Sequence, residues 1–310
     1  MRRMEDIRRM EDIRRMEDIR GNIAFKVYPD ATALARAAAE HFVTLAARTT
    51  ATRGHFAVAL AGGSTPRATY ALLATDTAAL ARAAARVDWS RVHVFWGDER
   101  CVPPDHPESN YRMARQALLD HVPIPTSNVH RIRGELPPDQ AAAAYRVELD
   151  TVLGPDRRFD LILLGMGTDG HTASLFPPLS PALAGPQSSA FAGPQSGDPH
   201  HHHPPPPLAG PQPPALAGPQ SGDPRPATPV VAVYVEHLHA WRVTLTLPVI
   251  NAAHHVLFLV SGAAKADALA RVRAGEPLPA ALVRPTQGQL TWSVDRQAIP
   301  GHEAKDGRQR

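Results

Sequence analysis

A histidine and an aspartate stand together in a glycine-rich segment near the middle of the chain. The segment begins as the apolar run Leu161–Leu164, passes through three glycines, and carries Asp169 and His171. Imidazole is the side chain that most readily gains or loses a proton near neutral pH, and it is the commonest general base. A nearby carboxylate can orient it and fix its tautomer. We therefore take His171 as the candidate base and Asp169 as its partner, although Asp169 could equally be a turn former before Gly170.

Three further apolar runs, each predicted to be a strand, also end in polar residues. The ends are Gly62-Gly63-Ser64-Thr65 after residues 55–60, Gly97-Asp98-Glu99-Arg100 after residues 92–96, and Ser261-Gly262 with Lys265 after residues 255–260. The carboxyl ends of parallel strands lie at one edge of a sheet, where open α/β folds bind their ligands. The four polar segments are therefore predicted to converge in one crevice.

Each of these segments suits a different task. The Gly62–Thr65 turn offers backbone N–H groups at a helix start, which suits a phosphate or another anion, but hydroxyl residues there are also ordinary helix caps. Arg242 and Lys265 are natural phosphate partners, although a lone lysine on a helix is usually just solvated. Asp98 and Arg100 could form an ion pair with each other, or either could contact a ligand.

The remaining pattern alternates strands with helices, which predicts a parallel α/β sheet with flanking helices. Helical spacing covers residues 31–48, 68–85, 110–119 and 139–153, and further helices are expected from residue 248 and from residue 265. Residues 230–235 and 242–247 are β-prone. No nucleophile elbow or Walker loop is present. Residues 165–170 spell the dinucleotide-binding pattern Gly-x-Gly-x-x-Gly, but His171 and the pair Pro177-Pro178 do not allow the long helix that should follow it.

Composition narrows the range of functions. The chain has 310 residues, of which 43% are apolar, and this is enough for a substantial core. The net charge is +3 without a basic stripe interleaved with aromatics, so no nucleic-acid partner is expected. Cys101 is the one cysteine, which excludes an intrachain disulfide and suits a reducing compartment. We expect no membrane span, no signal peptide and a cytoplasmic location.

Two segments differ from the rest in composition. Residues 2–19 repeat Arg-Arg-Met-Glu-Asp-Ile three times, and we interpret residues 1–22 as a charged tail without a catalytic role. Residues 179–228 are rich in proline and contain Ala-Gly-Pro-Gln four times, so they are predicted to be a disordered insertion. The run His200–His203 within it could bind metal adventitiously or have no specific ligand. This leaves a single α/β domain over residues 23–178 and 229–300, with a polar tail over 301–310.

The chain resembles the 6-phosphogluconolactonase family in a series of motifs that occur in the family's order. They are Leu60–Pro66, Trp96–Arg100, Ser109–Tyr111, Gly165–Pro177, Arg242–Pro248 and Ser261–Lys265. The resemblance implies a Rossmann-like domain shared with glucosamine-6-phosphate isomerases. It also implies hydrolysis of 6-phospho-D-glucono-1,5-lactone to 6-phosphogluconate in the oxidative pentose phosphate pathway, with no metal and no organic cofactor. A monomer would be adequate, and association with glucose-6-phosphate dehydrogenase is left open.

The resemblance also implies roles for individual residues. Arg242 and Lys265 would hold the phosphate, helped by the turn at residues 62–65. Asp98 and Arg100 would contact the sugar or stabilise charge, and Asn110 belongs to the same binding set. Neutral His171 would take a proton from the attacking water. The chain departs from the family in its repeat and its insertion, which follows Pro178 and could restrict the mouth of the site.

Two alternative functions share this fold. A glucosamine-6-phosphate isomerase/deaminase has the same Asp-Gly-His turn, but there the turn continues toward a glutamate-containing stretch, and Thr172–Pro177 contains no glutamate. A non-enzymatic sugar-phosphate sensor would need a DNA-binding module. The N-terminal repeat is too short for a helix-turn-helix, and no basic recognition helix is evident elsewhere.

Overall fold

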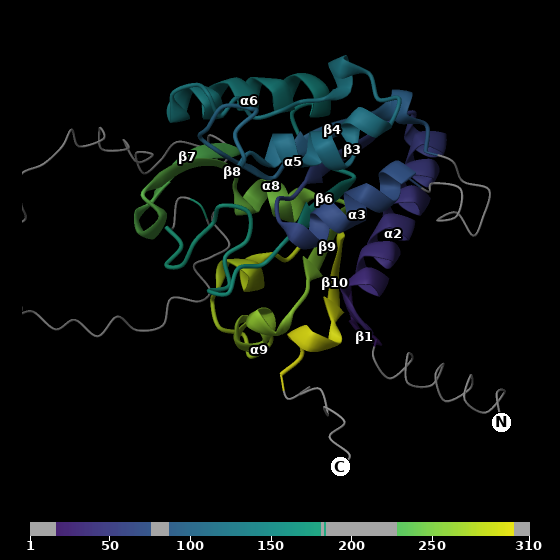
Figure 1. Cartoon of the computed structure of the whole chain (residues 1–310), viewed down its shortest axis with the longest axis vertical. Helices are drawn as coiled ribbons and strands as arrows, with labels where there is room; N and C mark the ends of the chain where they lie inside the picture. The colour runs from purple at the N-terminus through teal and green to yellow at the C-terminus, as the bar shows by residue number, and fades with distance from the viewer. Residues whose placement is uncertain (1–16, 76–86, 181–182, 184–227, 301–310) are drawn as a thin grey trace, which may run out of the picture.

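Two β-sheets and a set of covering helices make up the computed structural model, which describes residues 17–75, 87–180, 183 and 228–300 (Figure 1). The larger sheet has the strand order β1-β2-β10-β9-β6-β3-β4. Strands β2, β10, β9, β6, β3 and β4 run parallel, and β1 at the edge is antiparallel to β2. The prediction of a Rossmann-like parallel sheet with flanking helices is therefore confirmed.

Some strands of this sheet could be predicted from the sequence, and others could not. Their bounds are β1 Glu17–Arg20, β2 Ile23–Tyr28, β3 Phe56–Leu60, β4 Val92–Trp96, β6 Leu161–Leu164, β9 His255–Val260 and β10 Gln289–Asp295. Strands β3 and β6 are buried at every position, because helices cover both faces of a parallel sheet. Strands β2 and β10 were not predicted. Strand β10 has a polar residue at every second position, which weakens its apolar signal.

The helices follow the predicted pattern with shifted ends. Their bounds are α2 Ala31–Arg53, α3 Ser64–Thr75, α5 Asn110–Ala117, α6 Pro138–Leu153, α8 Leu247–Ala252 and α9 Ala266–Arg273. Helix α2 begins after Asp30, whose carboxylate accepts a hydrogen bond from the Ala33 amide at 2.8 Å, and it ends at Gly54. Helix α3 begins four residues before its predicted start, and the rest of its predicted range, residues 76–86, lies outside the described residues.

The order of the strands creates a crevice between β3 and β6. From β3 the chain continues to β4 on one side, and it later returns through β6 to β9 and β10 on the other side. The neighbouring strands β3 and β6 are thus the point at which the strand order reverses, and such a point leaves space at the carboxyl ends of the strands.

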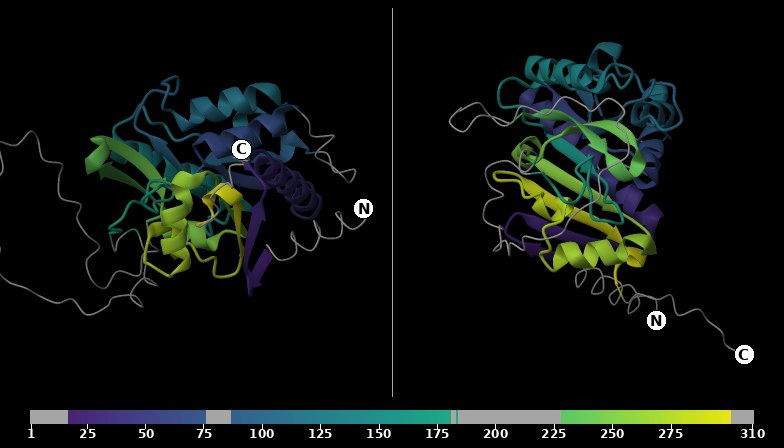
Figure 2. Two further views of the ribbon diagram at one scale, coloured as in Figure 1. Left: turned by 60° about the horizontal axis from the view of Figure 1, so that its bottom comes forward. Right: turned by 90° about the vertical axis from the view of Figure 1, so that its left-hand side faces the viewer.

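A second sheet corrects two expectations about the chain. Strands β5 Asp98–Arg100, β8 Ala240–Leu245 and β7 Val230–Val235 are antiparallel, in the order β5-β8-β7, and α6 packs against β7 and β8 (Figure 2). Residues 230–235 and 242–247 were expected only to be β-prone, in a chain whose sheet was predicted to be parallel. They pair as an antiparallel hairpin, because the short η5 helix Glu236–Leu238 and His239 between them are too few residues for a crossover. The segment from Asp98 to Arg100, expected as a turn, pairs with β8 instead.

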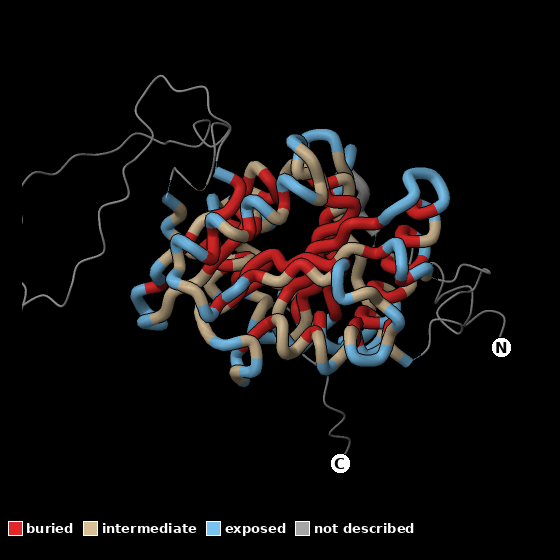
Figure 3. The backbone as a smooth tube through the Cα atoms, turned by 90° about the horizontal axis from the view of Figure 1, so that it is seen from above, coloured by how far each residue is buried: buried red, intermediate tan, exposed pale blue. Residues whose placement is uncertain are grey.

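Buried residues form one continuous core between the main sheet and its helices (Figure 3). The predicted apolar face of the first helix is buried there: Leu34 and Phe42 have no exposed surface. Phe258 of β9 and Trp292 of β10 stack with ring centroids 3.9 Å apart. Strand β1 falls within residues 1–22, the segment interpreted as a tail, because the chain turns at Gly21-Asn22 and pairs with β2. No helix in the described ranges is long and apolar enough to cross a membrane.

We expect Asp160→Ala to destabilise the fold without disturbing the carboxyl edge of the sheet. Asp160, 3% exposed, accepts a hydrogen bond from the Ala57 amide at 2.8 Å and pairs with Arg53, at the amino end of β3. Leaving that amide unpaired should lower the free energy of unfolding by about 1–3 kcal/mol in urea titrations. The control Asp150→Ala removes the partner of Arg157 at the surface, and it should change the free energy of unfolding by less than about 1 kcal/mol. Equal losses in the two variants would contradict the prediction.

Candidate active site

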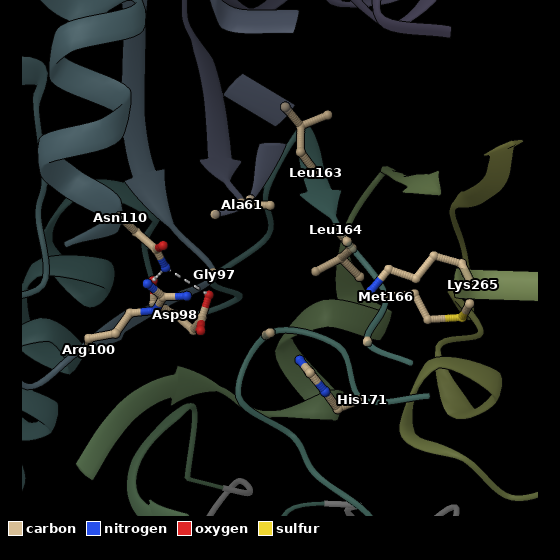
Figure 4. Close-up of a pocket in the computed structure, with 15 residues that line it drawn as sticks. Ala61, Gly97, Asp98, Arg100, Asn110, Leu163, Leu164, Met166, His171 and Lys265 are labelled. Atoms are coloured by element: carbon tan, nitrogen blue, oxygen red, sulfur yellow. Dashed lines mark hydrogen bonds between the residues drawn. The ribbon is translucent and has the colours of Figure 1, made fainter. Parts of the chain in front are cut away.

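A pocket of about 210 Å³ opens at the carboxyl ends of β3, β4, β6 and β9 (Figure 4). Its lining includes seven of the predicted site residues: Gly62, Gly63, Asp98, Arg100, Asn110, His171 and Lys265. The convergence expected from the four strand ends is therefore what the structure shows. Ser64, Thr65, Asp169 and Arg242 are not among the lining residues.

His171 enters the pocket from the glycine-rich turn that follows β6. Its Nδ1 atom lies 2.6 Å from Oδ1 of Asp169, which also accepts a hydrogen bond from the His171 amide at 3.1 Å. Because an ionised carboxylate can only accept, Nδ1 is the donor of this hydrogen bond, and Nε2 is the ring nitrogen that can exchange a proton with a ligand or water. Burial acts to raise the pKa of Asp169, but hydrogen bonds from His171 and its charge hold that pKa below the ordinary value. Asp169 thus remains ionised and orients the ring from behind.

The turn itself depends on glycine at two positions. A side chain on Gly167 would collide with Nδ1 of His171 and Oδ1 of Asp169, and the Gly167 amide donates to the His171 carbonyl at 2.8 Å. Gly170 has φ of +84°, in the left-handed region, and a side chain there would collide with Leu278. These residues therefore leave space for the pair and set the direction of the imidazole.

Phe176 is a contact of His171 that the sequence did not single out. The centroid of the Phe176 ring lies 4.2 Å from that of the His171 imidazole. The Phe176 ring also contacts His237, at the tip of the β7–β8 hairpin, with centroids 5.4 Å apart. The aromatic contact limits rotation of the imidazole about its χ angles. In the sequence, Ser174-Leu175-Phe176-Pro177 is part of a motif shared with the family. The spacing of the motif does not predict that the phenyl ring packs against His171.

Asp98 and Asn110 form a buried hydrogen-bonded wall. The Asn110 amide group donates to the Asp98 carbonyl at 3.0 Å and to its carboxylate at 3.3 Å, and Ser174 donates to the other carboxylate oxygen at 2.7 Å. Gly62 has no room for a side chain because Asn110 packs against it. The side chain of Asp98 is therefore fixed on both oxygens, and it joins the β4, β6 and α5 segments at the pocket.

Glu99 was missed as a site residue, and it organises the start of α5. Its carboxylate accepts hydrogen bonds from the amides of Arg100, Asn110 and Tyr111, each at 2.8 Å, and from the Ser109 hydroxyl at 3.0 Å. An anion at a helix N-terminus is favoured by the helix dipole. Burial raises the pKa of Glu99, and the backbone hydrogen bonds oppose this. Glu99 thereby holds Asn110 in place without reaching the pocket.

Two arginines lie directly opposite each other in the second sheet. Arg100 of β5 pairs in register with Arg242 of β8, and within the described ranges the Nε atoms of both are buried without a hydrogen-bond partner. Arg100 also donates to the Glu108 carbonyl. Burial and the charge of Arg100 lower the pKa of Arg242. Buried Nε–H donors of guanidinium groups that have no protein acceptor are suited to an anionic ligand.

Lys265 lies across the pocket from Arg100, beside Met166 (Figure 4). It ends the short helix η6, Ala263–Lys265, and its amide donates to Gly262 at 3.0 Å. Gly262 in turn donates to the buried carboxylate of Asp295 at 3.0 Å. The structure thus places cationic groups on two opposite walls of the pocket.

The turn after β3 contributes backbone groups. Among the described residues, the amides of Gly62 and Gly63 donate to no protein acceptor, and Gly63 has φ of +103°. Ser64 is exposed, and with Thr65 it forms the first turn of α3. Of the predicted turn, the two glycines therefore reach the pocket and the two hydroxyl residues begin the helix. Over the same described residues, no three His, Cys, Asp or Glu side chains are grouped to hold a metal ion.

Comparison with known proteins places the chain in a family. It matches the family described as glucosamine-6-phosphate isomerases/6-phosphogluconolactonase over residues 29–203 and 217–292, and it belongs to that family. It is 39% identical to the 6-phosphogluconolactonase of Synechocystis sp. over 257 residues, covering 80% of this chain and 85% of the relative. It is 35% identical to the 6-phosphogluconolactonase of Mycobacterium tuberculosis over 288 residues, covering 89% and 96%.

Solved structures agree with this assignment. The 6-phosphogluconolactonase of Thermotoga maritima superposes with a TM-score of 0.65 at 27% identity, covering 88% of this chain and 99% of that one. The 6-phosphogluconolactonase of Trypanosoma brucei gives a TM-score of 0.65 at 26% identity, covering 88% and 96%.

We predict that Gly167→Ala reduces turnover by about a hundredfold or more, because the new methyl group displaces the His171–Asp169 pair, and misplacement by about 1 Å can have that effect. Gly165→Ala is the matched variant in the same turn, since its methyl group would meet only the Gly62 carbonyl oxygen at 3.9 Å. Steady-state rates and circular dichroism of both variants check this. Similar activity losses in the two would show that the collision at Gly167 is not the cause.

Proposed function

We propose that the protein hydrolyses 6-phospho-D-glucono-1,5-lactone to 6-phosphogluconate, as a 6-phosphogluconolactonase of the oxidative pentose phosphate pathway. The observation that carries the proposal is the His171–Asp169 pair, in which the carboxylate binds Nδ1 and leaves Nε2 to act as the base, in a pocket with cationic walls. A base facing bound water suits ester hydrolysis, and the cationic walls suit a phosphorylated substrate. The relatives that carry this name support the same assignment.

The chemistry needs one base and one electrophile. His171 Nε2 removes a proton from water as the oxygen attacks the lactone carbonyl carbon. The resulting tetrahedral oxyanion collapses, the bond from carbon to the ring oxygen breaks, and the imidazolium returns its proton to that oxygen. The product is an open-chain acid that ionises in water. The hydrogen bond from Nδ1 to ionised Asp169 stabilises the imidazolium formed midway.

Binding is assigned to the walls of the pocket and to Arg242, which does not line the pocket but pairs in register with the lining residue Arg100. Lys265, Arg242 and the free amides of Gly62 and Gly63 hold the phosphate, and Arg100, Asp98 and Asn110 contact the sugar or its developing charge. The unpartnered Nε atom of Arg242 and the position of Lys265 on the lining support these roles. Donors close to the carbonyl oxygen would lower the barrier most if they are in place before reaction.

We further propose that the chain works as a monomer in the cytoplasm. A single cysteine, Cys101, suits a reducing compartment. Burial, followed by the charge of Glu99, raises the pKa of its thiol to about 11, which keeps it unreactive. Association with glucose-6-phosphate dehydrogenase is part of the same proposal. Sedimentation velocity of the protein alone tests the monomer, and a dimer would reject it. The same measurement with glucose-6-phosphate dehydrogenase tests the association, and the absence of co-sedimentation would reject it.

His171→Ala should reduce lactone hydrolysis to the rate of spontaneous ring opening, because His171 is the one imidazole among the described residues that line the pocket. The lactone is generated in the cuvette by glucose-6-phosphate dehydrogenase, and the product is read with 6-phosphogluconate dehydrogenase. His121→Ala, at the surface on the short helix Leu119–His121, is the matched control and should keep the wild-type rate. A wild type no faster than spontaneous opening would reject the function, and ammonia release from glucosamine 6-phosphate would favour the isomerase instead.

Lys265→Ala and Arg242→Ala should each raise KM by about 10–100-fold, since a hydrogen bond to a charged group contributes about 1.5–3 kcal/mol. The effect should be confined to the phosphorylated lactone and absent with glucono-1,5-lactone, which lacks the phosphate. Arg36→Ala, at the exposed face of α2, is the control. Equal losses with both lactones would place these cations at the sugar and not at the phosphate.

A further inference from the structure

A single buried hydroxyl binds both backbone groups of the residue at which β3 leaves the sheet. Tyr70 of α3 donates to the Ala61 carbonyl at 2.9 Å and accepts from the Ala61 amide at 2.9 Å. The tyrosine has no exposed surface, and Ala61 is 7% exposed and lines the pocket. One residue earlier, the Leu60 carbonyl accepts a hydrogen bond from the amide of Gly97, directly after β4, at 2.9 Å.

The neighbouring strand ends in the same way. Tyr145 of α6 accepts from the Trp96 amide at 2.8 Å and donates to the Trp96 carbonyl at 2.9 Å, at the last residue of β4. Burial raises the pKa of both tyrosines, so each hydroxyl keeps its proton and can donate and accept at once. Two helices thus use one side chain each to fix two adjacent strand ends.

The hydroxyl of Tyr70 has a direct consequence for the pocket. Ala61 immediately precedes Gly62 and Gly63, whose amides are without acceptors in the described part of the protein. The orientation of the Gly62 amide follows from the peptide plane of Ala61, whose carbonyl is held by Tyr70. Helix α3 begins directly after the turn and carries Tyr70, so the same bond also fixes the helix relative to the strand end.

We propose that Tyr70 is a positioning residue for ligand binding: its hydroxyl holds Ala61 so that the amides of Gly62 and Gly63 are preset to bind the substrate's phosphate group. This rests on the proposed function. The tyrosine touches no ligand. It acts through the turn. Because two glycines, the most flexible residues of a chain, are already ordered, less conformational entropy is lost when the ligand binds.

Tyr70→Phe removes the oxygen and keeps the ring. We expect the Kd for 6-phosphogluconate, measured by calorimetry, and the KM for the lactone to rise by about tenfold or more, the ratio that corresponds to roughly one hydrogen bond. Turnover at saturation should change much less, because His171 lies on a different turn. The Kd for gluconate, which has no phosphate, should stay unchanged.

Two controls separate positioning from stability. Asp160→Ala removes a comparable backbone contact at the opposite end of β3 and should lower the melting temperature with an unchanged Kd. Tyr234→Phe, at an exposed tyrosine of β7, should change neither. If Tyr70→Phe melts at a lower temperature but binds 6-phosphogluconate as the wild type does, the hydroxyl only stabilises the fold and the proposal is overturned. A wild type that neither hydrolyses the lactone nor binds the product rejects the function itself.

Hydrogen exchange on the wild type keeps the proposal testable if Tyr70→Phe does not fold. Without ligand, the Ala61 amide should be protected, and the amides of Gly62 and Gly63 should exchange rapidly. Added 6-phosphogluconate should slow exchange at both glycines, and gluconate should not. Rapid exchange at Ala61 without ligand, or no change at the glycines with 6-phosphogluconate, would overturn the proposal.

Discussion

Backbone groups at the carboxyl ends of the parallel strands must find partners where the sheet ends, and the pocket depends on how this is done. Each of the four strands that form it ends at a backbone group bound by a side chain from a later segment. The pairs are Tyr70 with Ala61, Tyr145 with Trp96, Thr172 with Gly165, and Asp295 with Gly262. A buried backbone group without a partner costs about 1–3 kcal/mol. These side chains therefore stabilise a sheet edge that stays open to a ligand.

Buried carboxylates also bind donor groups around the pocket. Asp98, Glu99 and Asp295 are each at most 7% exposed. Asp98 accepts from the Ser174 hydroxyl and the Asn110 side-chain amide, and the other two accept from backbone amides and hydroxyls. A buried carboxylate is tolerated only when its oxygens are satisfied in this way. Because these acids are occupied by protein donors, the negative charge near the pocket is largely bound internally. Arg100, Arg242 and Lys265 are then left to attract an anion.

The sequence predicted the parts of the site that depend on local order along the chain. An apolar run followed by glycines and an acid marks a strand end, and this placed His171, Asp98 and Lys265 correctly at one edge. It could not predict pairing between distant segments. The second sheet arises because β5 meets β8, about 140 residues later in the chain. The contacts of Glu99, Phe176 and Tyr70 likewise depend on side chains brought together by packing, which no spacing in the sequence records.

The separation of tasks between the strand ends has a consequence for how the activity can vary. The proposed base, His171, lies on the turn after β6, whose shape is set by glycines, whereas the proposed phosphate contacts lie at the ends of β3 and β9 and on β8. Changes in the turn after β6 act on a group needed only as charge develops, so they reduce turnover. Changes at the other strand ends weaken ground state and transition state together, so they raise KM. The two parts meet at Ser174, whose hydroxyl donates to Asp98 and whose amide donates to the Thr244 hydroxyl of β8. A change in the turn that leaves Ser174 in place is therefore expected to act on turnover alone.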